Sequence, residues 1–271
     1  MKKYKALALD IDGTLLNTKK QVTPKVLEGI QTLQNAGIPV MIASGRPEQG
    51  IAHVAKAIGM DVHGGYVLSY NGGKITEYKT GETVYNNTVP MEYNTEIIEY
   101  ATGIPTAAIL TYERDAIITE MPENEYVLLE SRVVKMPVKK VASLKEAVVS
   151  PVNKFLIVGK PEVLKEYVSK MAEQFRGRLN IFQSEPFFIE IVPLGIDKAK
   201  SLDYLLGTLG LSGEELVACG DGGNDVTMIA YAGMGIAMEN ACEEVKRVAK
   251  DITSSCDEDG VARAIEKYFK E

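Results

Sequence analysis

Short apolar runs that end in glycine or polar residues recur along the first part of this chain. One run covers residues 6–9 and another covers residues 38–43. Continuous apolar runs of this length are typical of strands that are buried on both faces of a parallel sheet. Between them, Thr23-Pro24 has the form of a helix start, with a capping hydroxyl followed by proline in the first turn. Strand and helix in alternation predict an α/β fold.

The pattern changes from Pro90 onward, where short apolar stretches and helical periodicities are mixed without regular alternation. Clustered strands with helices between them indicate an α+β unit. The predicted strands lie near residues 107–111, 116–119, 154–158, 179–183 and 187–191, and the predicted helices near 92–101, 123–131, 143–148 and 161–175.

The parallel pattern returns after Pro193. A helix is predicted to begin at Asp197-Lys198, and buried strands are predicted at residues 216–219 and 233–237. Similar halves at both ends, with a different unit between them, indicate an insertion. We therefore predict a Rossmann-like parallel-sheet core made of residues 1–81 and 194–271, with an inserted α+β domain at residues 82–193.

The net charge of −7 argues against nucleic acid as the main partner, because binding a phosphate backbone requires a basic face. There is no signal-peptide pattern and no apolar run near transmembrane length, so no membrane partner is expected. The three cysteines show no Cys-x-x-Cys spacing and are expected to be reduced. Together these features predict a cytoplasmic protein.

Two carboxylates, Asp10 and Asp12, follow the first predicted strand directly. Crowded like charges are costly without a cation between them, so the pair suggests a hard metal ion, most simply Mg²⁺. An ordinary turn is the alternative, since aspartate and glycine are common there. An EF-hand is set aside because Leu15 and Gln21 occupy the places where its loop needs glycine and glutamate.

Three further segments carry candidate chemistry. Ser44-Gly45 ends the second predicted strand, where a hydroxyl and backbone N–H groups can meet a phosphate, although a plain strand-to-helix turn would look the same. Lys198 begins a helix, where a solvated side chain is the alternative. Residues 220–225 form an Asp- and Gly-rich strand end. The role of Arg46 stays open, and it could be either a phosphate contact or an ion pair.

Taken together, these motifs resemble those of the haloacid dehalogenase superfamily of phosphatases, and within it the Cof-type group with a large inserted cap. The matching motifs are DIDGTLL, SGR, YNG, the lone Lys198 and GDGGNDVTM, in that order. The resemblance implies a Mg²⁺-dependent phosphomonoester hydrolase of small phosphorylated metabolites, in particular sugar phosphates. It also implies that the inserted domain is a cap, which we expect to close over the cleft and select the leaving group.

The resemblance implies a role for each matching residue. Asp10 is the nucleophile that forms an aspartyl-phosphate, and Asp12 is the general acid and base. Mg²⁺ is bound by Asp10, the main-chain carbonyl of Asp12, and Asp221. The phosphate is held by the side chains of three residues and by main-chain N–H groups, and two more residues support the site. The residues that bind the phosphate are Ser44, Lys198, Asn224, Ile11 and Gly45, and the supporting residues are Thr14 and Asp225.

Two other functions remain open at this point. A phosphomutase on the same scaffold would return the phosphate to a sugar instead of to water. A non-catalytic protein that binds a phosphorylated metabolite would need no nucleophile beside an acid, so the carboxylates argue against it. A purely structural module would leave those carboxylates without a compensating partner. The oligomeric state is not predicted.

Overall fold

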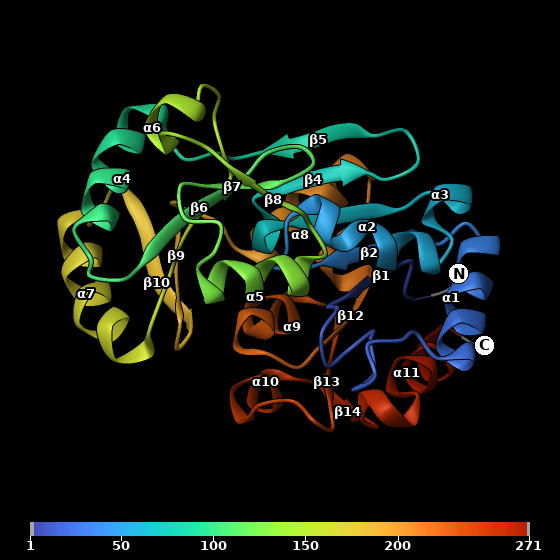
Figure 1. Cartoon of the computed structure of the whole chain (residues 1–271). Helices are drawn as coiled ribbons and strands as arrows, with labels where there is room; N and C mark the ends of the chain where they lie inside the picture. Colours follow the sequence, from blue (N-terminus) through green and yellow to red (C-terminus); the bar gives the residue numbers. More distant parts are fainter. Residues whose placement is uncertain (1–2, 270–271) are drawn as a thin grey trace. The chain divides into compact units, whose positions relative to one another are not determined.

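The computed structural model describes residues 3–269, which form two compact units. The first unit contains the residues up to Tyr85 and those from Asp197 onward, and the second unit contains Asn86–Ile196 (Figure 1). The second unit is thus inserted in sequence between two parts of the first.

Within the described residues, the first unit contains an eight-stranded sheet in the order β14-β13-β12-β1-β2-β3-β4-β5. The six strands from β14 to β3 are mutually parallel, and β4 runs antiparallel to β3. The strands are β1 (Ala6–Leu9), β2 (Val40–Ala43), β3 (Tyr66–Ser69), β4 (Lys74–Glu77), β5 (Glu82–Asn86), β12 (Leu216–Gly220), β13 (Met234–Met238) and β14 (Asp251–Thr253).

The chain leaves β1 in one direction across the sheet and reaches β12, β13 and β14 in the other. Right-handed crossovers then place the helices α1 and α9 on opposite faces, and the order reverses between β1 and β12. Ligands of open α/β sheets bind at such a switch point, beyond the carboxyl ends of the strands. The helices are α1 (Pro24–Asn35), α2 (Glu48–Ala57), α3 (Met60–His63), α8 (Lys198–Thr208), α9 (Val226–Tyr231), α10 (Glu243–Val248) and α11 (Gly260–Phe269).

Burial explains why these segments form these elements. All four residues of β1 are buried, as a central parallel strand requires. In α1, Val26, Ile30 and Leu33 recur at helical spacing and face the core. Thr23 caps this helix, because its hydroxyl accepts a hydrogen bond from the backbone N–H of Val26. Single-turn helices complete the unit at Tyr70–Gly72, Gly213–Glu215, Gly223–Asp225 and Cys256–Glu258.

The second unit contains a six-stranded, mainly antiparallel sheet in the order β10-β11-β9-β6-β7-β8, counted over the described residues. Helices α4 and α7 pack on this sheet around their own apolar cluster. The strands are β6 (Ala108–Tyr112), β7 (Ile117–Thr119), β8 (Val138–Lys140), β9 (Phe155–Val158), β10 (Leu179–Glu185) and β11 (Phe188–Pro193). The helices are Met91–Tyr93, α4 (Asn94–Thr102), α5 (Glu125–Val134), α6 (Leu144–Ala147) and α7 (Pro161–Gln174).

The predicted α/β fold with a parallel sheet is confirmed. The structure places the boundary between the two units later than the sequence does, because residues 82–86 pair with β4 in the first sheet. The first unit therefore extends to Tyr85, past residue 82, where the predicted inserted domain begins. The division into a core and a cap stays a prediction. Across residues 3–269, no helix is both long enough and apolar enough to cross a membrane.

Candidate active site

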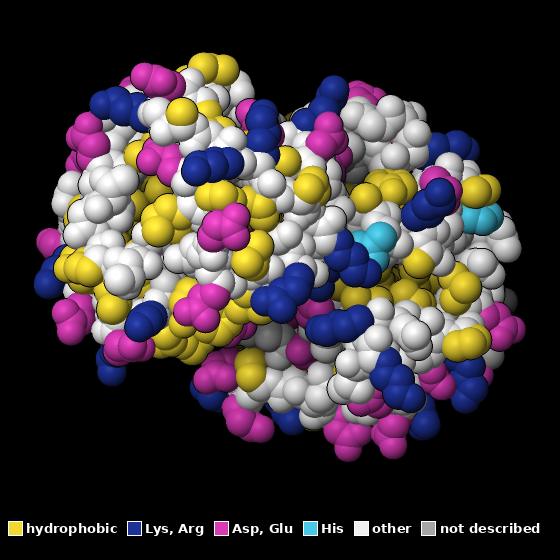
Figure 2. Space-filling model, viewed as in Figure 1, with side chains coloured by type: hydrophobic (Ala, Val, Ile, Leu, Met, Phe, Trp, Pro, Cys, Tyr) yellow, Lys and Arg dark blue, Asp and Glu magenta, His cyan; other side chains and the backbone are white. Residues whose placement is uncertain are grey.

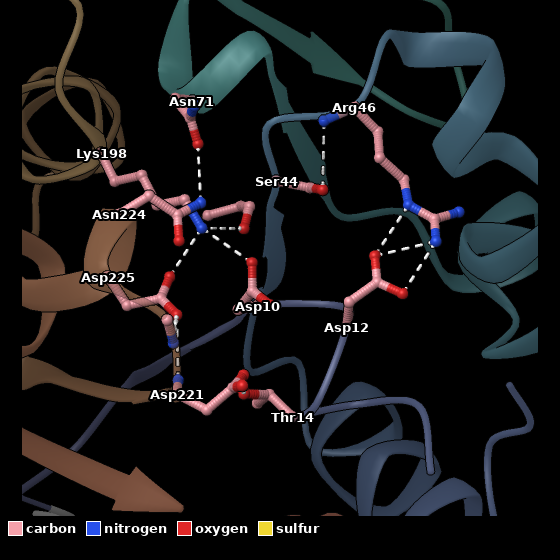
Figure 3. Close-up of polar contacts among 12 residues, drawn as sticks. Asp10, Asp12, Thr14, Ser44, Arg46, Asn71, Lys198, Asp221, Asn224 and Asp225 are labelled. Carbon is pink, nitrogen blue, oxygen red and sulfur yellow. Dashed lines mark hydrogen bonds and ion pairs between the residues drawn. The ribbon is translucent and has the colours of Figure 1, made fainter. Parts of the chain in front are cut away.

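Three loops of the first unit and the start of α8 carry the residues that the sequence singled out. The loops follow β1, β2 and β12, which are adjacent parallel strands, so their carboxyl ends meet at one edge of the sheet. Asp197 caps α8 by accepting a hydrogen bond from the backbone N–H of Lys200 at 3.1 Å, which makes Lys198 the first helical residue. Figure 3 shows the side chains that gather there.

Lys198 is the buried cation at the centre of this group, with 1% of its surface exposed. Its Nζ donates to Asp10 Oδ1 at 2.7 Å and to Asp225 Oδ1 at 2.6 Å. The third hydrogen bond runs to the main-chain oxygen of Ala43 at 2.8 Å. All three protons of the ammonium group are therefore used. The alternative of a solvated lysine is wrong for this residue.

The pKa values of this group follow from burial and charge. Burial alone would lower the pKa of Lys198, but the negative charges of Asp10 and Asp225 outweigh it and raise the pKa to about 12. Burial is the main cause that raises the pKa of Asp10 to about 8, and the charge of Asp225 adds to it. Burial likewise raises the pKa of Asp221 to about 6. The carboxylates outnumber the positive charge available to them, so a further cation would stabilise their ionised forms.

The donor atoms fit a hard divalent cation. One oxygen each from Asp10, Asp221 and Asp225 lie within 4.8 Å of one another. Asp225 is already occupied, because its Oδ1 accepts from Lys198 and its Oδ2 accepts from the backbone N–H groups of Asp221 and Gly222, both at 2.9 Å. By contrast, the hydrogen bonds from Lys198 to Asp10 and from Thr14 to Asp221 each use only Oδ1. Asp10 and Asp221 are therefore the two carboxylates that could hold Mg²⁺, and Asp225 organises the loop.

Gly13 and Thr14 position Asp221. Gly13 has a left-handed φ of +81°, and a Cβ there would lie 2.2 Å from Asp221 Oδ2, so only glycine allows this approach. The Thr14 hydroxyl donates to Asp221 Oδ1 at 2.7 Å. Asn240 holds the same loop by donating to the main-chain oxygen of Gly13 at 2.8 Å. The Gly-Thr part of the pattern Asp-x-Asp-Gly-Thr thus joins the loop after β1 to the loop after β12.

Asp12 has different surroundings from Asp10. Its side chain is 40% exposed, and it accepts two hydrogen bonds from Arg46, from Nε at 2.9 Å and from Nη2 at 2.8 Å. Lys20 Nζ donates to the same carboxylate at 2.8 Å. Partial burial would raise the pKa of Asp12, but the charges and hydrogen bonds of Arg46 and Lys20 together lower it. Arg46 thus forms the ion pair that was one of its two expected roles, and a phosphate contact stays a prediction.

The predicted phosphate-binding residues lie around this group. Ser44 is buried and directly follows Ala43, whose main-chain oxygen binds Lys198. The Ser44 hydroxyl accepts from the backbone N–H of Arg46 at 3.3 Å. The side chain of Asn224 donates to Asn71 Oδ1 at 2.9 Å. The roles of main-chain N–H groups near Ile11 and Gly45, and of the main-chain oxygen of Asp12, stay predictions.

Sequence reasoning gave no role to three residues that the structure places here, Lys20, Asn71 and Asn240. Lys20 and Asn240 stand in no motif, and their contacts depend on how distant loops meet, so no sequence signal could have found them. Asn71 did carry a signal, because it belongs to the Tyr-Asn-Gly turn that follows β3. That turn is one of the motifs that carry the family resemblance, but the resemblance gave Asn71 itself no role.

Comparisons with known proteins agree with this geometry. The model of a family described as haloacid dehalogenase-like hydrolases matches residues 7–265. A Streptococcus pyogenes protein named as a phosphatase is 30% identical over 267 residues, with 97% of this chain and 98% of that protein covered. A Bacillus subtilis protein named as the phosphatase YxeH is 30% identical, with 97% of each chain covered.

A solved structure of a haloacid dehalogenase-like hydrolase from Bacteroides thetaiotaomicron is also similar. It superposes with a TM-score of 0.94 at 43% identity, and 98% of this chain and 99% of that chain are covered. The names of these curated relatives agree with the phosphatase class, and the matching family model agrees with the Cof-type group that the motifs predict. The chain belongs to the haloacid dehalogenase-like hydrolase family, and the prediction of an enzyme of that superfamily is confirmed.

Proposed function

We propose that the protein is a Mg²⁺-dependent phosphomonoester hydrolase of small phosphorylated metabolites, with Asp10 as the nucleophile. The observation that carries the proposal is the arrangement of Asp10, which is buried, paired with Lys198 and within reach of the Asp221 carboxylate. A structural ion pair would not need a third carboxylate that lacks a cation. An anion-binding site alone would not need a carboxylate beside the anion.

In the first step, an oxygen of Asp10 attacks phosphorus and the bond from phosphorus to the ester oxygen breaks. This gives an aspartyl-phosphate and a leaving alkoxide, which takes a proton from Asp12. Splitting the hydrolysis into two displacements replaces one difficult step with two easier ones. Lys198 and Ser44 stabilise the charge on the phosphoryl oxygens, where positioning and electrostatics carry most of the catalysis.

In the second step, water attacks the phosphorus of the aspartyl-phosphate, and Asp12 takes a proton from that water. The bond to Asp10 breaks, so phosphate leaves and the Asp10 carboxylate is restored. The ion pairs with Arg46 and Lys20 keep Asp12 ionised, which is the form that this step requires. For the first step Asp12 must carry a proton, so the substrate has to weaken its contact with Arg46.

Mg²⁺, when bound, masks the repulsion between Asp10 and the phosphoryl oxygens and orients both. Asp10 and Asp221 would hold it through their carboxylates, because the hydrogen bonds from Lys198 and from Thr14 each use only Oδ1. Thr14 fixes the second oxygen of Asp221, and Asp225 fixes the backbone of the same loop. These supporting contacts keep the two carboxylates in place before the ion arrives.

The proposed substrates are sugar phosphates and related metabolites. A Bacillus subtilis relative, 27% identical over 97% of this chain, is named as a phosphatase of 5-amino-6-(5-phospho-D-ribitylamino)uracil. That substrate name describes a phosphate ester on a sugar-alcohol chain. We further propose that the inserted unit acts as a cap that selects the leaving group, and that the enzyme works in the cytoplasm on small molecules. Figure 2 shows basic and acidic side chains interspersed on the visible face, which fits a small-molecule substrate better than nucleic acid.

The test is phosphate release from a generic aryl phosphate with and without Mg²⁺, for the native protein and for Asp10→Asn. Asp61→Asn is the matched control, because Asp61 is an exposed aspartate on α3. We expect Mg²⁺-dependent release by the native protein and by the control but not by Asp10→Asn. Equal release by Asp10→Asn would refute the proposal. With a sugar phosphate in place of the aryl phosphate, an isomer formed without free phosphate would identify a phosphomutase instead.

A further inference from the structure

The turn after β3 has an unusual backbone. Tyr70, Asn71 and Gly72 have φ values of +54°, +57° and +92°, so three consecutive residues adopt left-handed conformations. Glycine adopts this region freely and asparagine does so more readily than most residues, but tyrosine rarely does. Such a backbone persists only where the surrounding structure holds it, and it is enriched at functional sites.

Two of the contacts that hold the turn come from the loop after β2. The backbone N–H of Tyr70 donates to the main-chain oxygen of Arg46 at 3.0 Å, and that of Asn71 donates to the main-chain oxygen of Ser44 at 2.8 Å. Both tyrosine and asparagine therefore bind the segment that contains Ser44 and Gly45. The unusual backbone aims successive N–H groups at one loop of the proposed phosphate site.

The third residue of the turn binds the helix that carries Lys198. Ser201 Oγ donates to the main-chain oxygen of Gly72 at 2.8 Å. A Cβ on Gly72 would lie 2.3 Å from the same Oγ, so the contact requires glycine. Ser201 lies one helical turn after Lys198 on α8. Its contact with Gly72 therefore ties the position of the turn after β3 to the position of the Lys198 ammonium group.

The side chain of Asn71 reaches the remaining loop. Its Oδ1 accepts from Asn224 Nδ2 at 2.9 Å, across a separation of 153 residues, as Figure 3 shows. An amide nitrogen carries two protons, so using one of them fixes the direction of the other. The Asn71 amide also lies over Gly45, because a Cβ on Gly45 would be only 3.1 Å from Asn71 Nδ2.

We infer that Asn71 is a positioning residue of the phosphate site, which orients the carboxamide of Asn224 and packs over Gly45. The left-handed turn that carries Asn71 links the three anion-binding segments, namely the Ser44 loop, the Lys198 helix and the Asn224 loop. The inference rests on the proposed function, because it takes these segments as the ones that hold the phosphoryl group. The backbone conformation alone would not carry it, since asparagine adopts left-handed φ values in ordinary turns.

The test compares Asn71→Gly with Asn224→Ala and with the double variant. Glycine keeps the left-handed backbone and removes only the carboxamide. The readouts are the Kd of inorganic phosphate by calorimetry in the presence of Mg²⁺, kcat/KM on an aryl phosphate, and the melting temperature. We expect Asn71→Gly to weaken phosphate binding and to lower kcat/KM by about tenfold, with the double variant no worse than Asn224→Ala alone.

Lys135→Gly is the matched control, because Lys135 has a similar left-handed φ of +54° at the end of α5 and lies in the other unit. It should leave both phosphate affinity and kcat/KM unchanged. Asn71→Ser provides a second variant with a side chain too short to reach Asn224, in case the glycine variant does not fold. Phosphate binding distinguishes the role of Asn71 from the proposed phosphatase activity. It tests the role of Asn71 even if the native protein releases no phosphate from esters.

Three results would overturn the inference. The first is native phosphate affinity and kcat/KM in Asn71→Gly. The second is a double variant whose loss equals the product of the single losses, which would mean that the two residues act independently. The third is loss of melting temperature and activity together in every Asn71 variant while Asn224→Ala loses neither, which would make the turn merely structural.

Discussion

Asp10 and Asp12 are two residues apart in one loop, yet their surroundings are opposite. Asp10 is 7% exposed at the end of a central strand and shares a buried ammonium group with Asp225. Asp12 lies beyond the sheet, with its side chain 40% exposed and held by Arg46 and Lys20. The pKa of Asp10 is raised, mainly by burial, and the net effect of two cations lowers that of Asp12.

One residue type can therefore serve two tasks in the same loop. A buried carboxylate that lacks enough positive charge attracts a metal ion and stays fixed, which suits a nucleophile. A partly exposed carboxylate that is paired with two cationic side chains can exchange those partners, which suits proton transfer. The predictions below test this contrast between a fixed and an exchangeable carboxylate.

The largest effect is expected from the two carboxylates themselves. Asp10→Asn should lower kcat by roughly a thousandfold or more, as loss of a nucleophile generally does. Asp12→Asn should still form the aspartyl-phosphate from an aryl phosphate, because an aryl oxide leaves without a proton. Rapid-quench kinetics should therefore show a burst of aryl oxide from Asp12→Asn and none from Asp10→Asn. Bursts from both variants would remove the distinction.

The buried cation should matter next. Lys198→Met leaves Asp10 and Asp225 close together without their shared partner, so we expect a loss of about 3 to 5 kcal/mol in the free energy of unfolding. Lys20→Met is the matched change, because it removes an exposed lysine that pairs with Asp12. It should change the free energy of unfolding by no more than about 1 kcal/mol. Chemical denaturation measures both. Similar losses for the two lysines would contradict the contrast in burial.

The stabilisation of the protein by Mg²⁺ should depend on the buried carboxylates and not on the side chain of Asp12. At a concentration one hundred times its Kd, Mg²⁺ should add about 2.7 kcal/mol to the stability of the native protein, and chelation should remove it. Asp221→Asn should abolish this gain, because it removes one of the two carboxylates available to the ion. Asp12→Asn should keep it, since only the main-chain oxygen of Asp12 is proposed as a ligand. Thermal melts with and without Mg²⁺ decide the point.

The smallest effect concerns the partners of Asp12. Removing Arg46 takes away a bidentate cation, so the pKa of Asp12 should rise. Because Asp12 must be ionised in the second step, the acid limb of the kcat profile should then move to higher pH in Arg46→Gln. Lys20→Gln should move it less, since the Lys20 side chain is 63% exposed. An equal shift, or a shift to lower pH, would show that Arg46 does not govern Asp12.

The sequence predicted the parts of the fold whose pattern is strong. The runs at residues 6–9 and 216–219 are central strands because parallel strands are apolar on both faces. The pattern is weak at two strands, β8 and β14. Both are short edge strands, and β8 contains two exposed lysines, so neither has an apolar run to mark it.

The candidate site likewise contains residues that motifs predict and residues that only the fold reveals. The residues in motifs, Asp10, Asp221 and Lys198, do come together, because each stands at a strand end or helix start that the fold brings to one edge. The partners of these residues could not be predicted in the same way. The ion pair between Asp12 and Arg46 and the contact of Asn71 with Asn224 join loops that are far apart in sequence, and only the assembled fold determines them.

The most direct test of the central claim is to locate the phosphoryl group during turnover. Asp12→Asn is mixed with a radiolabelled aryl phosphate and Mg²⁺, quenched with acid within one turnover and digested into peptides. We expect the label to accumulate on the peptide that contains Asp10, because Asp12, the base for hydrolysis of the aspartyl-phosphate, is missing. Label on a different residue, or consumption of substrate with no labelled protein at any time, would contradict it.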